Sequence, residues 1–243
     1  MVDIIHLNNT YLTYLSPLLK WRVMDLESLR KECASAPKYH TFCRVIRGLE
    51  NKKILEGYRD PFNRKKYVYL SSFGEGQLSN HENPTSVSRD TLIHDIKVSE
   101  IAKAFCDRGW ASEVELEHQL HDKRNFKVTY KIIPDALFHG EKKGAKLKIA
   151  LEVELSRKNN QRIVEKARQY MDSGYYNYVL YFFCKRNFMQ QYIELFEEKL
   201  GKESMGRFMF FVDDAMTGKT LSLDGVEGIF KGNSVKMGQV FGH

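Results

Sequence analysis

Three acidic residues stand in segments that otherwise have the pattern of buried β-strands. Asp135 lies in the run Ile-Pro-Asp-Ala-Leu-Phe, and Glu152 and Glu154 lie in Leu-Glu-Val-Glu-Leu shortly after it. Side chains alternate faces along a strand, so the two glutamates point the same way. Carboxylates among apolar residues repel one another and lose solvation, so they require a proton or a cation. Such oxygen ligands suit Mg²⁺ or Mn²⁺, and a divalent metal on a sheet commonly serves to attack phosphodiesters.

A structural role accounts for the same acids. Glu152 and Glu154 would then form an ion-pair network with cations that follow them in the chain. The cations at suitable spacing are Arg157, Lys158, Arg162 and Lys166. The sequence leaves both the metal site and this network open.

The elements predicted around these acids alternate in a way that indicates an α/β sheet. We expect helices over 91–108, 160–172 and 188–200, and strands over 113–120, 127–138, 147–155, 178–184 and 207–212. The chain from 217 onward is rich in glycine and weakly periodic, which predicts a loosely packed tail.

The N-terminal part has a different pattern. Apolar spacing predicts two helices within 10–34, with Asp25 placed to cap the second, and a third helix over 37–51. Two short strands over 53–59 and 66–70 then flank a turn, which is the order of a winged helix-turn-helix. We therefore predict a winged helix over 1–73, a polar linker over 74–84, a sheet domain over 85–215 and a tail over 216–243.

Basic residues are concentrated in the third predicted helix and the hairpin. Between Lys38 and Lys66 nine basic residues accompany three acidic ones, which favours a polyanion as partner. A recognition helix in the major groove with a basic wing on the phosphates requires this distribution. The candidate DNA-binding residues are Lys38, His40, Arg44, Arg47, Arg59, Arg64, Lys65 and Lys66. A winged helix that binds protein is the alternative.

Five segments together resemble a known family. They are Ile93-His94-Asp95 with Val98, Ile133-Pro134-Asp135-Ala136, Leu151-Glu152-Val153-Glu154, Lys166-Ala-Arg-Gln-Tyr170, and the hairpin with Tyr67-Val-Tyr-Leu70. Their order resembles the PD-(D/E)XK (restriction endonuclease-like) mixed-sheet fold. It is more closely similar to the replication–relaxation family of plasmids and integrative elements, in which a winged helix precedes such a domain.

The resemblance implies a site and a function. Asp135 and Glu152 would hold Mg²⁺ or Mn²⁺, with Glu154 at the position where lysine is usual and Lys166 or Lys158 supplying the ammonium from further along the chain. The protein would bind DNA in plasmid replication control or in DNA relaxation and mobilisation, with metal-dependent nicking as its enzymatic activity. The alternative is a non-catalytic transcriptional or copy-number regulator that uses the nuclease-like fold for dimerisation or protein contacts. Glu154 in place of lysine favours that alternative.

Composition sets the remaining expectations. The chain has 243 residues, a formal net charge of +7 and four scattered cysteines, which indicate free thiols in a reducing compartment. No apolar stretch approaches the length of a membrane span, and residues 1–10 lack the pattern of a signal peptide. We expect a cytoplasmic protein with double-stranded DNA as its partner, a homodimer as a candidate assembly, and no membrane association.

Overall fold

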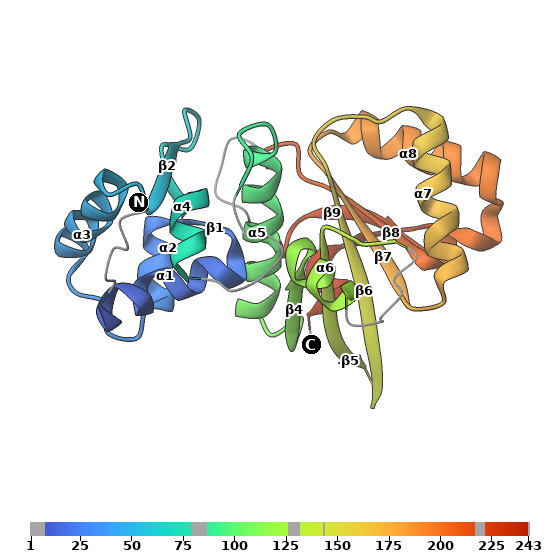
Figure 1. Ribbon diagram of the computed structural model, residues 1–243. Coiled ribbons are helices and arrows are strands. Elements are labelled where there is room, and N and C mark those ends of the chain that lie inside the picture. Colours follow the sequence, from blue (N-terminus) through green and yellow to red (C-terminus); the bar gives the residue numbers. More distant parts are fainter. Residues whose placement is uncertain (1–7, 79–86, 126–131, 143, 217–221, 243) are drawn as a thin grey trace. The chain divides into compact units, whose positions relative to one another are not determined.

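The computed structural model describes residues 8–78, 87–125, 132–142, 144–216 and 222–242, and it divides the chain into two compact units. Unit 1 is Met1–Ser99 and unit 2 is Glu100–His243. The division falls inside helix α5 (Leu92–Asp107), which contributes to both units (Figure 1). Each unit combines helices with a sheet, so the predicted α/β class is confirmed.

Unit 1 places helices around a small antiparallel sheet. Its elements are α1 (Asn9–Trp21), β1 (Val23–Asp25), α2 (Leu26–Glu32), α3 (Tyr39–Asn51), β2 (Leu55–Arg59), β3 (Lys66–Leu70) and α4 (Ser72–Leu78), followed by the first half of α5. Strand β3 is central and pairs with β1 on one side and β2 on the other. The three predicted helices and the hairpin are present, while β1 was not predicted.

A local signal explains where α2 begins. The Asp25 carboxylate accepts hydrogen bonds from the backbone N–H groups of Glu27 (3.1 Å) and Ser28 (3.2 Å), which confirms its predicted role as the cap of α2. On α3 the stripe of Phe42, Ile46 and Leu49 is buried against the unit. The opposite side of α3 is left to exposed polar and charged residues.

The predicted linker over 74–84 is wrong in its first part. Helix α4 covers 74–78, and Gly74 is buried there, with its N–H donating to Ser71 Oγ (2.9 Å). A Cβ at this position would lie 2.0 Å from the Ile54 carbonyl oxygen, so the glycine permits close packing. Polar composition does not mark an exposed connector here, because Gly74 and Glu75 of this helix are buried. Residues 79–84 lie outside the described residues.

Unit 2 is built on a seven-stranded mixed sheet with the order β10-β9-β8-β7-β6-β5-β4. The strands are β4 (Glu113–Leu116), β5 (Ala136–Lys142), β6 (Ala145–Glu154), β7 (Tyr178–Phe183), β8 (Phe208–Val212), β9 (Glu227–Phe230) and β10 (Asn233–Lys236). Pairs β6–β7 and β7–β8 are parallel and the others are antiparallel. The remaining elements are α6 (Glu117–Asn125), α7 (Asn160–Ser173), α8 (Arg186–Leu200), a 3₁₀ turn (Lys202–Arg207) and α9 (Met237–Phe241).

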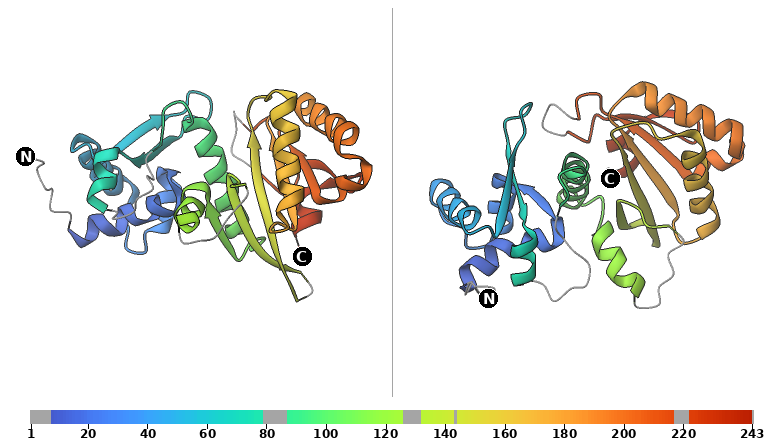
Figure 2. Two further views of the ribbon diagram at one scale, coloured as in Figure 1. Left: turned by 45° about the vertical axis from the view of Figure 1, so that its right-hand side comes forward. Right: turned by 45° about the horizontal axis from the view of Figure 1, so that its top comes forward.

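Helices α7 and α8 make the two parallel crossovers and lie on the same face of the sheet (Figures 1 and 2). Asn159 caps α7 by accepting a hydrogen bond from the Arg162 N–H (2.8 Å), and Gly174 ends it in the left-handed region (φ +60°). The core beneath these helices is rich in aromatic residues, among them Tyr181, Phe183 and Phe196. This dry face is where the acidic side chains of β6 must be accommodated.

The predicted strands 113–120 and 127–138 need correction. The first ends at Leu116, where the Gln119 side chain accepts from the Leu116 N–H (2.9 Å) and helix α6 begins. The second begins at Ala136, so Asp135 precedes the strand and does not lie inside it. Residues 127–131 lie outside the described residues.

The loosely packed tail predicted over 216–243 is also wrong where it is described. Strands β9 and β10 extend the sheet, and Leu223 and Met237 are fully buried. The two strands are joined by Lys231 and Gly232, both with positive φ, the backbone of a tight type I′ hairpin. Four-residue strands give too weak a periodicity to detect. Within the described ranges, every helix is too short or too polar to cross a bilayer.

Candidate functional site

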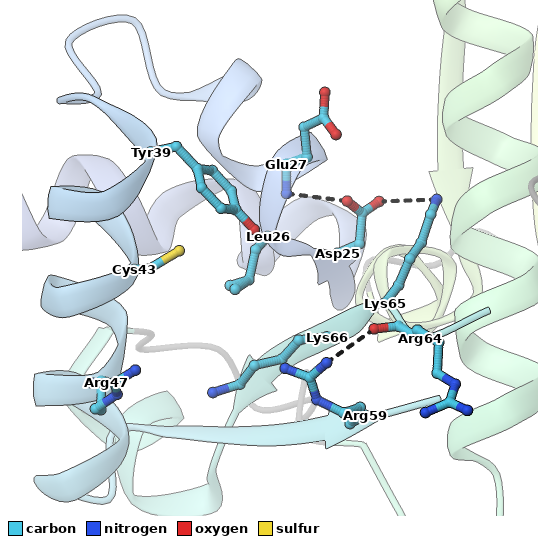
Figure 3. A pocket seen from close by; sticks show the side chains of 10 residues that line it. All are labelled: Asp25, Leu26, Glu27, Tyr39, Cys43, Arg47, Arg59, Arg64, Lys65 and Lys66. Carbon is cyan, nitrogen blue, oxygen red and sulfur yellow. Dashed lines mark hydrogen bonds and ion pairs between the residues drawn. The ribbon is translucent and has the colours of Figure 1, made fainter. Parts of the chain in front are cut away.

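Most of the predicted DNA-binding residues gather around one hollow of unit 1, which we call the basic groove (Figure 3). It has a volume of about 320 Å³. It is lined by Asp25, Leu26, Glu27, Tyr39, Cys43, Arg47, Arg59, Arg64, Lys65 and Lys66. Five of the eight residues predicted from the sequence are thus brought together.

Helix α3 and the hairpin form two walls of the basic groove. Tyr39, Cys43 and Arg47 are spaced four residues apart, so they lie on one face of α3. The hairpin supplies its cations from the end of β2, the connecting loop and the start of β3. The start of α2 closes the groove and adds Asp25 and Glu27 (Figure 3). Their spacing of four residues from Arg47 was the sequence signal that could have placed Tyr39 and Cys43 in this groove.

Ion pairs hold some of these cations and leave others exposed. Lys66 Nζ lies 2.6 Å from Glu50 Oε2, and Lys65 Nζ lies 3.8 Å from Asp25 Oδ2. Arg47 and Arg64 are exposed, and neither side chain makes a hydrogen bond or ion pair with any described residue. These two guanidinium groups are the ones ready to take an anionic ligand.

The loop at the tip of the hairpin is held by its own side chains. Buried Asp60 accepts hydrogen bonds from the N–H groups of Phe62 (2.7 Å) and Asn63 (3.3 Å). Asn63 accepts from the Lys65 N–H (2.8 Å) and donates to the Tyr67 hydroxyl (3.0 Å). The loop therefore presents its exposed side chains from a defined backbone conformation.

The other three predicted residues, Lys38, His40 and Arg44, lie at the start and on the outer side of α3. All three are exposed, but they do not line the basic groove. They extend the positive surface of α3 beyond it.

The predicted acids come together in unit 2 with residues of α7. We call Asp135, Glu152, Glu154, Lys166 and Tyr170 the acid–lysine cluster. The Val153 N–H donates to Asp135 Oδ2 (2.7 Å), which fixes Asp135 beside the strand segment that bears both glutamates. Lys166 Nζ donates to one oxygen of Glu152, and the Tyr170 hydroxyl donates to the other. Of the four cations considered as partners, Lys166 is thus the one that pairs with Glu152.

The spacing of α7 explains this pairing. Lys166 and Tyr170 are one helical turn apart and lie on the same face as buried Ile163 and Ala167, which pack on the sheet. Burial raises the pKa of Glu152 to about 7, and Lys166 limits that rise. Burial by itself would lower the pKa of Lys166, but Glu152 and Asp135 outweigh it and raise that pKa.

Glu154 is the least satisfied member of the acid–lysine cluster. It is 4% exposed, and its Oε2 accepts no hydrogen bond from any described residue. Burial raises its pKa, while Lys166 and Lys158 oppose the rise. The Tyr192 hydroxyl lies beside Glu154 without the geometry of a hydrogen bond. Three carboxyl groups therefore share this dry site, and the Lys166 ammonium contacts Glu152 directly.

The acid–lysine cluster is not a ready-made metal site. Among the described residues, no three His, Cys, Asp or Glu side chains are arranged to hold a metal ion. Both oxygens of Glu152 are engaged by Lys166 and Tyr170. A metal ion would therefore have to displace the ammonium of Lys166 from Glu152.

Comparisons of the chain with protein-family models, with curated proteins and with solved structures found no match in any of the three. The resemblance to the replication–relaxation family stays a prediction based on the sequence motifs.

Proposed function

We propose that this protein binds double-stranded DNA through the basic groove of unit 1. The observation that supports this most is the convergence of Arg47 from α3 and four hairpin cations on one hollow. Unit 1 also has the element order of a winged helix-turn-helix, in which the third helix enters the major groove. Arg47 would then contact base edges, and the hairpin would contact phosphates.

Unit 2 would be a nuclease-like PD-(D/E)XK domain. Its first helix, three strands, crossover helix and fourth strand follow the order of that fold, apart from the added α6. Asp135, just before β5, and Glu152, on the adjacent strand β6, would be the acids that this fold carries. The whole chain would act for a mobile element, in plasmid replication control or in DNA relaxation and mobilisation.

A second candidate function is DNA nicking that depends on Mg²⁺ or Mn²⁺. Glu154 Oε2 is a buried oxygen without a hydrogen-bond donor among the described residues, and the Lys166 ammonium beside it is bound to Glu152. Asp135, Glu152 and Glu154 would hold the ion, and Lys166, released from Glu152, would stabilise charge on a phosphate oxygen. When bound, the metal would polarise the scissile phosphate and activate a water molecule.

The competing proposal is a non-catalytic regulator. It is favoured by the internal partners of Glu152, which satisfy both of its oxygens without a metal. In this case the nuclease-like unit would serve a homodimer or a protein contact. Incubation of the protein with supercoiled plasmid and Mn²⁺ separates the nuclease from the regulator. Nicking by the wild type but not by Asp135→Asn supports catalysis. Intact plasmid with both proteins supports the regulator.

The DNA-binding proposal is tested by gel shifts on unrelated duplexes. Arg64→Ala combined with Lys65→Ala should weaken binding to all of them alike, because phosphate contacts carry no sequence information. Arg47→Ala should instead change which duplexes are preferred. The matched control is Lys199→Ala with Lys202→Ala, two exposed lysines of unit 2. Equal affinities for the wild type and the hairpin variant would refute the proposal.

A further inference from the structure

Phe62, in the loop between β2 and β3, is unusually exposed. Its side chain is 74% exposed, the largest fraction for any large hydrophobic residue in the described part of the chain. Tyr39, on the α3 wall of the basic groove, follows at 51%. Two aromatic side chains are thus offered to solvent by the two elements proposed to contact DNA.

The loop presents Phe62 in a fixed way. Its N–H donates to buried Asp60 (2.7 Å), Pro61 precedes it, and Asn63 ties the loop to the Tyr67 hydroxyl (3.0 Å). Arg64 holds a positive φ of 63°, an uncommon conformation for a residue other than glycine. Because the backbone is already ordered, burying the phenyl ring in a partner would cost little additional entropy.

The neighbours of Phe62 identify the class of partner. The loop and the adjoining strand ends carry Arg59, Arg64, Lys65 and Lys66, and Phe62 is the one exposed large hydrophobic residue among the described residues of this hairpin. An apolar patch for a protein contact would need further exposed hydrophobic side chains beside it. A single apolar side chain among phosphate-binding cations matches proteins that insert a wedge between base steps and bend the duplex.

We propose that Phe62 enters the base stack of the bound duplex and kinks it beside the segment contacted by α3. This inference rests on the proposed DNA binding. A kink is least costly at pyrimidine–purine steps, which unstack easily, so such steps should be preferred near the hairpin.

The experiment measures bending and unstacking directly. A short duplex with a fluorophore at each end reports bending by energy transfer, and permanganate oxidation of thymines reports unstacked bases. The wild type should give both signals, and Phe62→Ala should lose both while its affinity falls roughly tenfold, as for one lost stacking contact. Phe62→Leu, which keeps an apolar wedge, should retain part of each signal. Leu12→Ala is the control, since Leu12 is another exposed apolar residue of unit 1.

The dependence of affinity on salt separates this role from electrostatic binding. Phe62→Ala removes no phosphate contact, so its slope of log affinity against log salt should equal the wild-type slope. Arg64→Ala with Lys65→Ala should reduce the slope. Bending and thymine reactivity unchanged in Phe62→Ala would overturn the inference and leave DNA binding standing. Loss of self-association alone would assign Phe62 to a protein contact. A wild type that binds no duplex would overturn the proposed function and this inference together.

Discussion

At the scale of single residues, Glu152 is a buried carboxyl group held on both of its oxygens. It is 1% exposed and is bound by Lys166 and Tyr170. An ion pair in such a site is weak evidence for stability, because desolvation offsets much of the attraction. The pairing instead keeps a carboxyl group in a fixed place on the sheet, next to Asp135.

Stability without divalent metal should fall as the pH rises from 5 to 8. The folded-state pKa of Glu152 is about 7, against an ordinary value of 4.5, so between these values the folded protein binds a proton that the unfolded chain has lost. The free energy of unfolding falls with rising pH wherever the folded state binds more protons than the unfolded chain. Here the fall amounts to about 3 kcal/mol in total. Urea unfolding across this range should show the fall in the wild type and a flatter profile in Glu152→Gln. Exposed Glu203→Gln is the control, and a rising wild-type profile would contradict the assignment.

Replacement of Lys166 by Met should destabilise the protein by about 3 kcal/mol at pH 8, because it leaves a buried carboxylate without its cation. The cost should be smaller at pH 5, where a proton can neutralise Glu152. Lys202→Met, at an exposed position of unit 2, is the matched control. Equal losses at the two pH values would mean that Lys166 stabilises by packing alone.

At the scale of elements, the sequence was informative where periodicity was long. The thirteen residues of α3 and the fourteen of α7 give a clear apolar stripe, and caps such as Asp25 are local. Strand β1 has three residues, and β9 and β10 have four each, too few to show a period. Strands β1 and β9 also pair with strands further away in the sequence, β3 and β8, which no local pattern reveals.

The candidate sites follow the same division. Proximity of Asp135 to Glu152 and Glu154 was predicted because neighbouring strands must lie side by side. The sequence did not predict which of four nearby cations pairs with Glu152. The pairing with Lys166 depends on how α7 is rotated over the sheet. The sequence predicted the cations that line the basic groove. It did not predict the acids at the start of α2, because the tertiary fold brings them there.

Two glycines of α4 should respond in opposite ways to alanine. Gly74→Ala should destabilise unit 1 by about 1–3 kcal/mol, because the new Cβ would meet the Ile54 carbonyl 2.0 Å away. Gly76→Ala has no atom within 4 Å of its Cβ and should stabilise the protein by about 0.5–1 kcal/mol through helix propensity. Chemical unfolding of both variants measures this, and a tolerated Gly74→Ala would contradict the close packing of α4.

At the scale of the whole molecule, the chain joins two units with different chemistry. Unit 1 offers exposed guanidinium groups around the basic groove, and unit 2 holds buried carboxyl groups beside Lys166. The first is suited to hold a polyanion and the second to gain from a further cation.

Binding of Mn²⁺ should stabilise unit 2 by about 2.7 kcal/mol at a hundredfold excess over the dissociation constant. Calorimetric melts with and without the metal should therefore differ for the wild type and coincide for Asp135→Asn. Exposed Glu203→Gln should behave as the wild type. A wild-type melt that does not change with Mn²⁺ would assign the acid–lysine cluster to structure, in favour of the regulator.

The central claim, that the basic groove holds duplex DNA, is tested most directly by the salt dependence of binding. Fluorescence anisotropy on one labelled duplex over a salt series gives both affinity and slope for the wild type and for Arg64→Ala with Lys65→Ala. Loss of two phosphate contacts should lower the affinity and reduce the slope by roughly two. The control Lys199→Ala with Lys202→Ala removes the same charge from unit 2 and should leave the slope unchanged. A hairpin variant with the wild-type affinity and slope would contradict the claim.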